Sequence, residues 1–176
     1  MKRVRVGLVS DTHGLFEPRL VELFAGCDLL LHAGDIVGPE ILRDLARIAP
    51  VRAVRGNNDI GPAYDALPEV AWVELGPLTA LVVHEIGART RLAAPVRRAL
   101  TERPAEIVVH GHSHRPGAAL EGGLLFVNPG SAGRRRFSLP RAAGLLQTCG
   151  RHVAVRLFDV ADARLPLLAP PLEMDL

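Results

Sequence analysis

Five short polar segments recur along this 176-residue chain, and each follows a run of apolar residues. The apolar runs have the length and composition of buried β-strands, and they cover residues 4–9, 29–31, 51–54, 78–83 and 107–109. The polar segments are rich in Asp, Asn and His, and they are Asp11-Thr12-His13, Gly34-Asp35, Gly56-Asn57-Asn58-Asp59, His84 and Gly111-His112-Ser113-His114. Because the carboxyl ends of strands in an open α/β sheet face a shared crevice, we expect these side chains to converge.

The side chains in these segments are typical metal ligands. Carboxylates, an amide oxygen and imidazoles suit Mn²⁺, Fe, Ni²⁺, Co²⁺ or Zn²⁺, and the absence of a thiolate argues against a structural zinc site. There are more candidates than one tetrahedral metal needs, whereas two metals about 3.5–4 Å apart and bridged by a carboxylate fit the number better. Asp35 lies in the middle of the series and is the expected bridge. The candidate metal ligands are Asp11, His13, Asp35, Asn57, His84, His112 and His114.

Each candidate ligand could also have an ordinary structural role. Asp11 and His13 could cap the helix that follows the first strand, and a single histidine such as His84 is more often a core or surface residue. Only their place in the series favours metal ligation. In contrast, His32 and His110 lie at the ends of apolar strands, where we expect hydrogen-bonded structural histidines.

The order of the expected elements indicates an α/β fold. Strands at 4–9, 28–32 and 51–55 alternate with helices at 18–25 and 39–48, and this order implies parallel strands with right-handed crossovers. The sequence therefore predicts a parallel arrangement in the first third of the chain.

The second part of the chain contains mainly strands. Residues 70–75 and 78–83 flank Gly76-Pro77 and predict a β-hairpin, which a helix at 92–100 follows. Further strands are expected at 107–110, 124–127, 143–148 and 153–160. The whole pattern predicts one domain over 1–176, with a mixed, largely two-layered β core flanked by helices and a proline-rich extended tail at 165–176.

Charge and hydropathy argue against several classes of function. The hydrophobic content of 48% is enough for a core of its own, and the net charge of +2 comes without a basic stripe, which argues against a nucleic-acid binder. No uncharged apolar run approaches the roughly 18 residues that cross a bilayer. The N-terminus also lacks the pattern of a signal peptide. We therefore expect a cytoplasmic protein that does not contact membranes.

The ordered motifs Asp-x-His, Gly-Asp, Gly-Asn-x-Asp, His and Gly-His-x-His resemble those of the calcineurin-like metallophosphoesterases, from Val4 to Ser131. The short length and the hairpin are similar to the small prokaryotic phosphodiesterase branch, which also includes the eukaryotic retromer scaffold subunit. The resemblance implies a four-layer α/β/β/α sandwich with two packed mixed β-sheets. It also implies that one metal binds Asp11, His13, Asp35 and His114, and that the other binds Asp35, Asn57, His84 and His112.

A few positions modify this picture. Asn58 stands where many members have a histidine that protonates the leaving group, and an amide can hydrogen-bond that group but cannot supply a proton. Asp59 stands where an acid often orients that histidine, and we assign Asn58 and Asp59 to the catalytic residues. Glu85 replaces a usual glycine, and it could either accept a hydrogen bond from a ligand or be a solvated loop carboxylate. The segment from Asn128 to Ser131 is similar to a family loop near the site, where we expect it to form a tight turn.

The chemistry expected of such a site is hydrolysis at phosphorus. A metal-bridging hydroxide would attack in line, opposite the leaving group, without a covalent phospho-enzyme. We expect a metal-dependent phosphodiesterase, with a phosphomonoesterase or a non-catalytic protein-binding scaffold of the same fold as alternatives. A nuclease is a weaker alternative because the chain has no room for accessory segments.

The expected cofactors are two divalent metal ions, with Mn²⁺ preferred and Fe, Ni, Co or Zn as alternatives. The expected substrate is a small phosphoester or a nucleotide-like molecule. The apolar hairpin at 70–83 could support a homo-oligomer.

Overall fold

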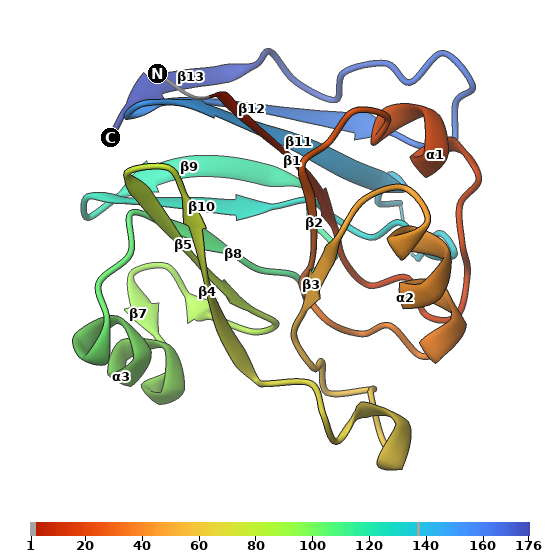
Figure 1. The fold of residues 1–176 in the computed structure, drawn as a ribbon, viewed down its shortest axis with the longest axis horizontal. Coiled ribbons are helices and arrows are strands. Elements are labelled where there is room, and N and C mark those ends of the chain that lie inside the picture. The colour runs from red at the N-terminus through yellow and green to blue at the C-terminus, as the bar shows by residue number, and fades with distance from the viewer. Residues whose placement is uncertain (1–2, 137) are drawn as a thin grey trace.

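Two mixed β-sheets form the centre of the molecule, in a computed structural model that describes residues 3–136 and 138–176 (Figure 1). The strands of the first sheet are β1 (Arg3–Val9), β2 (Leu29–His32), β3 (Val51–Ala53), β11 (Ala142–Cys149), β12 (His152–Asp159) and β13 (Leu172–Asp175). They form a 6-stranded sheet in the order β13-β12-β11-β1-β2-β3. β1, β2 and β3 are parallel to one another, as the sequence predicts, and β11 joins β1 antiparallel.

The second sheet has five strands and is also mixed. Its strands are β4 (Val70–Leu75), β5 (Leu78–Val83), β8 (Ile107–Val109), β9 (Gly117–Glu121) and β10 (Leu124–Asn128). They form a 5-stranded sheet in the order β4-β5-β8-β10-β9, in which β5, β8 and β10 are parallel. The predicted hairpin is confirmed with its expected bounds, since β4 and β5 pair antiparallel around Gly76-Pro77. A short pair, β6 (Gly87–Ala88) and β7 (Arg91–Leu92), lies outside both sheets.

The core between the sheets follows from the two-residue period of the strands. Val6 and Leu8 of β1 point to one face and belong to the same buried cluster as Ala80 and Val82 of β5. This cluster joins side chains of both sheets, so the sheets pack face to face. The prediction of two packed mixed β-sheets is confirmed.

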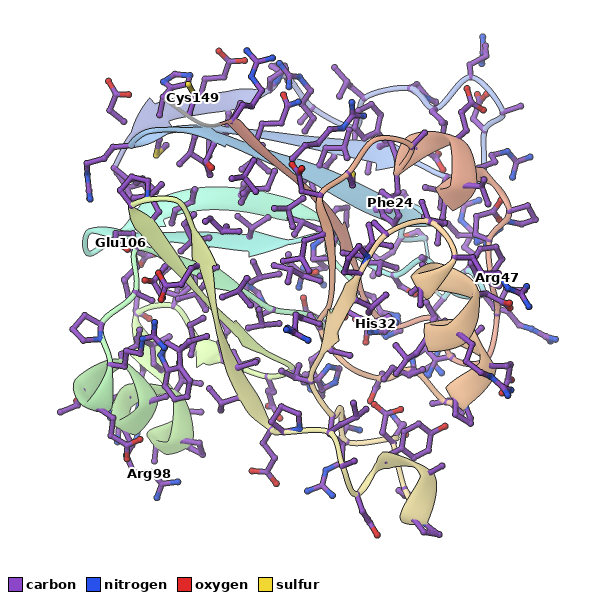
Figure 2. All side chains as sticks on the ribbon, in the orientation of Figure 1. Phe24, His32, Arg47, Arg98, Glu106 and Cys149 are labelled. Atoms are coloured by element: carbon purple, nitrogen blue, oxygen red, sulfur yellow. The ribbon has the colours of Figure 1, made fainter. Side chains whose placement is uncertain are left out.

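Helices cover the outer faces of the two sheets (Figure 1). α1 (Arg19–Leu23) and α2 (Pro39–Ala46) pack on the six-stranded sheet, whereas α3 (Ala94–Glu102) packs on the five-stranded sheet. Phe24, just after α1, is fully buried against the first sheet (Figure 2). A short 3-10 helix, η1 (Pro62–Tyr64), follows β3. No helix in the described ranges is long and apolar enough to cross a membrane.

Some strands were not predicted. β9 has the sequence Gly-Ala-Ala-Leu-Glu, without a β-branched residue, and becomes a strand because it pairs along β10 at the sheet edge. In the proline-rich segment from residue 165, β13 pairs antiparallel with β12. The end of the chain therefore extends the six-stranded sheet.

Candidate metal centre

The candidate ligands follow the carboxyl ends of strands in both sheets. Those that follow β1, β2 and β3 are Asp11, His13, Asp35 and Asn57. Those that follow β5 and β8 are His84, His112 and His114. Because the strands of each group are parallel, their ends meet at one side of the molecule (Figure 1).

Most of these residues have a left-handed backbone. The angle φ is 53° at Asp11, 47° at His13, 55° at Asp35, 65° at His112 and 58° at His114. A positive φ is uncommon outside glycine, although Asp and His tolerate it better than most residues. Such strained residues collect at functional sites, where the surrounding structure holds them in place. Here the left-handed residues turn the chain sharply after β1, β2 and β8.

Asp11, His13 and His114 form one potential metal-binding group, with ligand atoms within 4.8 Å of one another. His114 Nε2 lies 3.1 Å from Asp11 Oδ1 and 3.3 Å from His13 Nε2. The other oxygen, Asp11 Oδ2, accepts hydrogen bonds from Ser10 Oγ at 2.6 Å and from the His112 backbone N–H at 3.1 Å. Asp11 is thus held through one oxygen and points the other toward the histidines.

Asp11, Asp35 and His84 form a second group with the same spacing of 4.8 Å or less. Asp35 lies between the two groups, because its Oδ1 is 3.4 Å from His84 Nε2 and its Oδ2 is 3.8 Å from His13 Nε2. Asn57 Oδ1 extends the second group, at 3.0 Å from His84 Nε2 and 3.1 Å from His112 Nδ1. The structure therefore brings together all the side chains that the sequence selected as ligands.

The hydrogen-bonding pattern of this cluster fits bound cations. His84 Nδ1 lies 2.7 Å from the carbonyl oxygen of Ala33, so Nδ1 carries the proton. In neutral His84 the lone pair of Nε2 then faces the oxygens of Asn57 and Asp35, which are also acceptors. Likewise, Asp11 Oδ1 is buried and has no hydrogen-bond partner among the described residues. A cation among these lone pairs removes their repulsion, and the donor set is one that transition metals bind.

The charges of the cluster also favour cations. Burial raises the pKa of Asp35, but the neighbouring His84 imidazole and the hydrogen bonds from both nitrogens of Asn58 lower it more, so that the net shift is well below the usual range. Burial and the charge of Arg136 lower the pKa of His13. Asp35 is therefore ionised and His13 neutral near pH 7, which are the forms that bind metals.

His32, the last residue of β2, is fully buried in the interior (Figure 2) and supports the ligand loops through hydrogen bonds. Its Nδ1 accepts the Gly34 backbone N–H at 3.2 Å, so neutral His32 carries its proton on Nε2 and donates it to Thr12 Oγ1 at 3.1 Å. Thr12 Oγ1 in turn donates to the carbonyl oxygen of Ile36 at 3.1 Å. The prediction of a hydrogen-bonded structural histidine is confirmed, and its contacts hold the backbone of two ligand loops.

A second set of supporting contacts comes from the segment after β10. Asn128 Nδ2 donates to the carbonyl oxygen of Gly111 at 2.9 Å and to Ser113 Oγ at 3.0 Å, and its Oδ1 accepts the Gly130 backbone N–H at 2.8 Å. Ser131 Oγ donates to the carbonyl oxygen of Asp11 at 2.8 Å. The predicted turn is confirmed, and it also fixes the loop that carries His112 and His114.

Asn58 and Asp59 have different surroundings. Asn58 donates from its backbone N to Asp35 Oδ1 at 2.8 Å and from Nδ2 to Asp35 Oδ2 at 2.6 Å. Asp59 is buried, and its carboxylate accepts backbone N–H groups of Ile36 at 2.8 Å, Val37 at 2.9 Å and Gly56 at 2.8 Å. Asp59 thus joins the loop after β2 to the loop after β3, and it does not face the side chain of Asn58.

Glu85 lies on the exposed side of the cluster. Its Oε1 is 3.7 Å from His112 Nε2, the imidazole nitrogen that points away from Asn57. This distance is longer than a hydrogen bond. The side chain of Glu85 is also 58% exposed, so of the two interpretations that the sequence leaves open the structure favours the solvated loop carboxylate, which lies near a candidate ligand imidazole.

Two glycines, Gly56 and Gly111, let the ligand loops approach one another closely, a role that their place in the motifs did not by itself reveal. A Cβ on Gly111 would lie 2.6 Å from Asp11 Oδ2 and would also overlap Ser10 Oγ. A Cβ on Gly56 would overlap the backbone N and Oδ1 of Asp35. Both glycines immediately precede a candidate ligand, and that position was the signal available in the sequence.

Known proteins of one family are similar to this chain. Residues 4–151 match the calcineurin-like phosphoesterase superfamily domain. A probable metallophosphoesterase from Methanocaldococcus jannaschii is 35% identical over 136 residues, which cover 72% of this chain and 67% of that protein. The probable metallophosphoesterase YsnB from Bacillus subtilis is 31% identical over 165 residues, which cover 90% of this chain and 92% of that protein.

A solved structure shows the same fold. Vacuolar Protein Sorting 29 from Cryptosporidium parvum aligns with a TM-score of 0.79 and 21% identity, over 99% of each chain. At this identity the likeness concerns the fold alone. The domain match and the two metallophosphoesterase relatives confirm the resemblance that the motifs carry. This chain therefore belongs to the calcineurin-like phosphoesterase superfamily.

Proposed function

We propose that this protein is a phosphoesterase that depends on two divalent metal ions and hydrolyses phosphodiesters. The observation that carries the proposal is the convergence of ligand side chains from both sheets, with acceptor lone pairs facing one another around Asp35. One metal would be held by Asp11, His13, Asp35 and His114, and the other by Asp35, Asn57, His84 and His112. Mn²⁺ is the preferred metal, with Fe, Ni²⁺, Co²⁺ or Zn²⁺ as alternatives. When bound, such ions polarise phosphoryl oxygens and activate an attacking water.

Asn58 would act on the substrate in this reaction. Its Nδ2 has two hydrogens, and the hydrogen bond to Asp35 uses one of them. The second can bind a phosphoryl oxygen or the leaving oxygen, but an amide supplies no proton at neutral pH. Substrates with a good leaving group, such as p-nitrophenolate, should therefore react faster than esters whose leaving group is an alkoxide. Asp59 would be a positioning residue for the Asp35 loop.

The alternatives make different predictions. A phosphomonoesterase would prefer p-nitrophenyl phosphate to the corresponding diester. A non-catalytic protein-binding scaffold of the same fold could bind metal without turnover of either ester. The complete set of ligand side chains favours the enzyme.

The test is hydrolysis of bis-p-nitrophenyl phosphate and of p-nitrophenyl phosphate by chelated protein reloaded with each metal. We expect metal-dependent turnover, faster with the diester, and two metal equivalents by mass spectrometry. Asp35→Asn should lose both metal and activity by at least about 100-fold, because it removes the shared anionic ligand. Asp44→Asn is the matched control, since Asp44 lies on α2 and pairs with Arg47 at 2.9 Å. Two bound metals without turnover of either ester would overturn the enzyme and favour the scaffold.

A further inference from the structure

A cavity of about 320 Å³ opens beside the candidate metal centre, and two of the candidate ligands, Asn57 and His84, form part of its wall. Val70, Val83, Ala93 and Pro95 supply an apolar side of the same cavity. These residues come from the five-stranded sheet and from the start of α3. The ligands and the apolar side thus share one space, large enough for an aromatic ring or a short chain.

The charged residues of this cavity are not balanced. Arg55 Nη2 lies 3.0 Å from Glu69 Oε1, so these two charges form an ion pair. Glu85 also lines the cavity, and its nearest ionisable partner is His112 Nε2 at 3.7 Å. The cavity therefore contains one carboxylate beyond the Arg55–Glu69 pair. An anionic group placed here would meet the charge of Glu85, whereas hydroxyl or ammonium donors would find an acceptor.

We propose that this cavity holds one ester substituent of the substrate, and that this substituent has an apolar face and is neutral or cationic. The proposal rests on the proposed function, because the metal centre must hold the phosphoryl group for the substituent to reach the cavity. It assigns Val70, Val83 and Ala93 to the apolar contacts and Glu85 to the selection of charge. Substituents that carry a carboxylate or a second phosphate are discriminated against.

Binding of simple phosphonates to the metal-loaded protein tests the proposal without turnover. Isothermal titration calorimetry would compare methylphosphonate with phenylphosphonate, and 2-aminoethylphosphonate with 2-carboxyethylphosphonate. We expect phenylphosphonate to bind about tenfold more tightly than methylphosphonate, because its ring leaves water for the apolar side. We also expect the aminoethyl compound to bind about fivefold more tightly than the carboxyethyl compound, for which Glu85 is repulsive.

Two variants with matched controls test whether this cavity causes both differences in affinity. Ala93→Trp fills the cavity and should reduce the phenyl-to-methyl affinity ratio to near one, whereas Ala94→Trp, on the exposed neighbour outside the cavity, should keep the wild-type ratio. Glu85→Gln should reduce the ratio between the aminoethyl and carboxyethyl compounds. Glu102→Gln, at the far end of α3, should not change it.

The outcomes separate this proposal from the proposed function. If methylphosphonate binds but phenylphosphonate has no advantage, or if Ala93→Trp keeps that advantage, the substituent site is refuted while the metal centre stands. If the carboxyethyl compound binds as well as the aminoethyl compound, the charge selection is refuted. If the protein takes up no metal, or if no phosphonate binds to metal-loaded protein, the proposed function itself is refuted, and the substituent site is refuted with it.

Discussion

At the scale of single residues, the centre depends on conformations that its side chains do not favour. Asp35 and Val37 both have a positive φ, 55° and 50°, and a β-branched residue rarely adopts such an angle. The Asp59 carboxylate accepts the backbone N–H of Val37 as well as those of Ile36 and Gly56. These three hydrogen bonds maintain the turn that aims Asp35 at the histidines.

Asp59→Ala should therefore lower both stability and metal affinity. Three backbone N–H groups would lose their acceptor, and we expect a loss of about 3 kcal/mol in the free energy of unfolding. Urea denaturation of metal-free protein would measure this loss, and calorimetry would measure metal binding. The control is Asp65→Ala, on an exposed carboxylate after η1. If Asp59→Ala unfolded at the same urea concentration as this control, the positioning role would be wrong.

His32 predicts a pH dependence of stability. Burial lowers its pKa from 6.5 to about 4, so between these values the unfolded chain binds a proton that the folded chain does not. Neutral, buried His32 makes its full contribution to the free energy of unfolding above pH 6.5. This contribution is lost as the pH falls toward 4, a change on the order of 3 kcal/mol. Burial also lowers the pKa of His110 to about 4, so His110 likewise makes the free energy of unfolding fall as the pH falls.

The measurement is the unfolding free energy of metal-free protein from pH 7 to pH 4. His32→Gln should be less stable at pH 7 and should show a shallower loss of stability in acid, because one of the groups whose pKa burial lowers is gone. Parallel curves for the wild type and this variant would contradict the buried neutral state of His32.

At the scale of elements, close approach decides how the outer helices meet the sheets. A Cβ on Gly7 of β1 would lie 2.6 Å from Leu30 Cδ2 and 2.7 Å from Phe24 Cδ1, both tighter than real contacts allow. Leu30 belongs to the neighbouring strand β2, and Phe24 follows α1. The absence of a side chain at Gly7 therefore lets the end of α1 pack directly on the sheet.

Gly7→Ala should destabilise the protein by about 1–3 kcal/mol, since the added methyl group overpacks this contact. Gly117→Ala is the matched control, because a Cβ on Gly117 of β9 has nothing within 4 Å. Thermal unfolding of both variants would measure the difference. Equal melting temperatures would show that the α1 contact can move at little cost.

At the scale of the whole molecule, the candidate metal centre lies where loops of the two sheets meet. Asp11 and Asp35 belong to loops of the six-stranded sheet, and His84 and His114 belong to loops of the five-stranded sheet. Between the sheets lies a mainly apolar core, which holds them together without fixing their orientation. One buried hydrogen bond, from Thr148 Oγ1 of β11 to the carbonyl oxygen of Leu75 of β4 at 3.3 Å, also crosses between them. Metals shared by these loops would connect the sheets at one end.

Metal loading should therefore raise the melting temperature. Metal at 100 times its dissociation constant stabilises the folded state by about 2.7 kcal/mol, which corresponds to a shift of about 5–10 °C for a chain of this size. Differential scanning calorimetry with and without chelator would measure the shift. Asp35→Asn should show almost none, and a wild-type protein that melts at the same temperature in chelator would contradict the proposed site.

Much of the fold could be predicted because apolar periodicity and turn residues are local. The parallel order of β1, β2 and β3 and the hairpin of β4 and β5 follow from such patterns, and both are confirmed. β9 and β13 could not be predicted, because their own residues favour a strand only weakly and pairing at a sheet edge decides their conformation. The expected self-association through the hairpin stays a prediction, although β4 is an edge strand.

By itself, the sequence determined the parallel pairing of the strands near the N-terminus, the family and the set of candidate metal ligands, because each depends on residue types at short, regular spacing. Only the tertiary structure decided that Asp59 binds backbone N–H groups, that Glu85 lies beside His112, and that an apolar cavity adjoins Asn57. The physical reason is distance along the chain. These contacts join loops from different strands, and their geometry exists only when the two sheets have packed together.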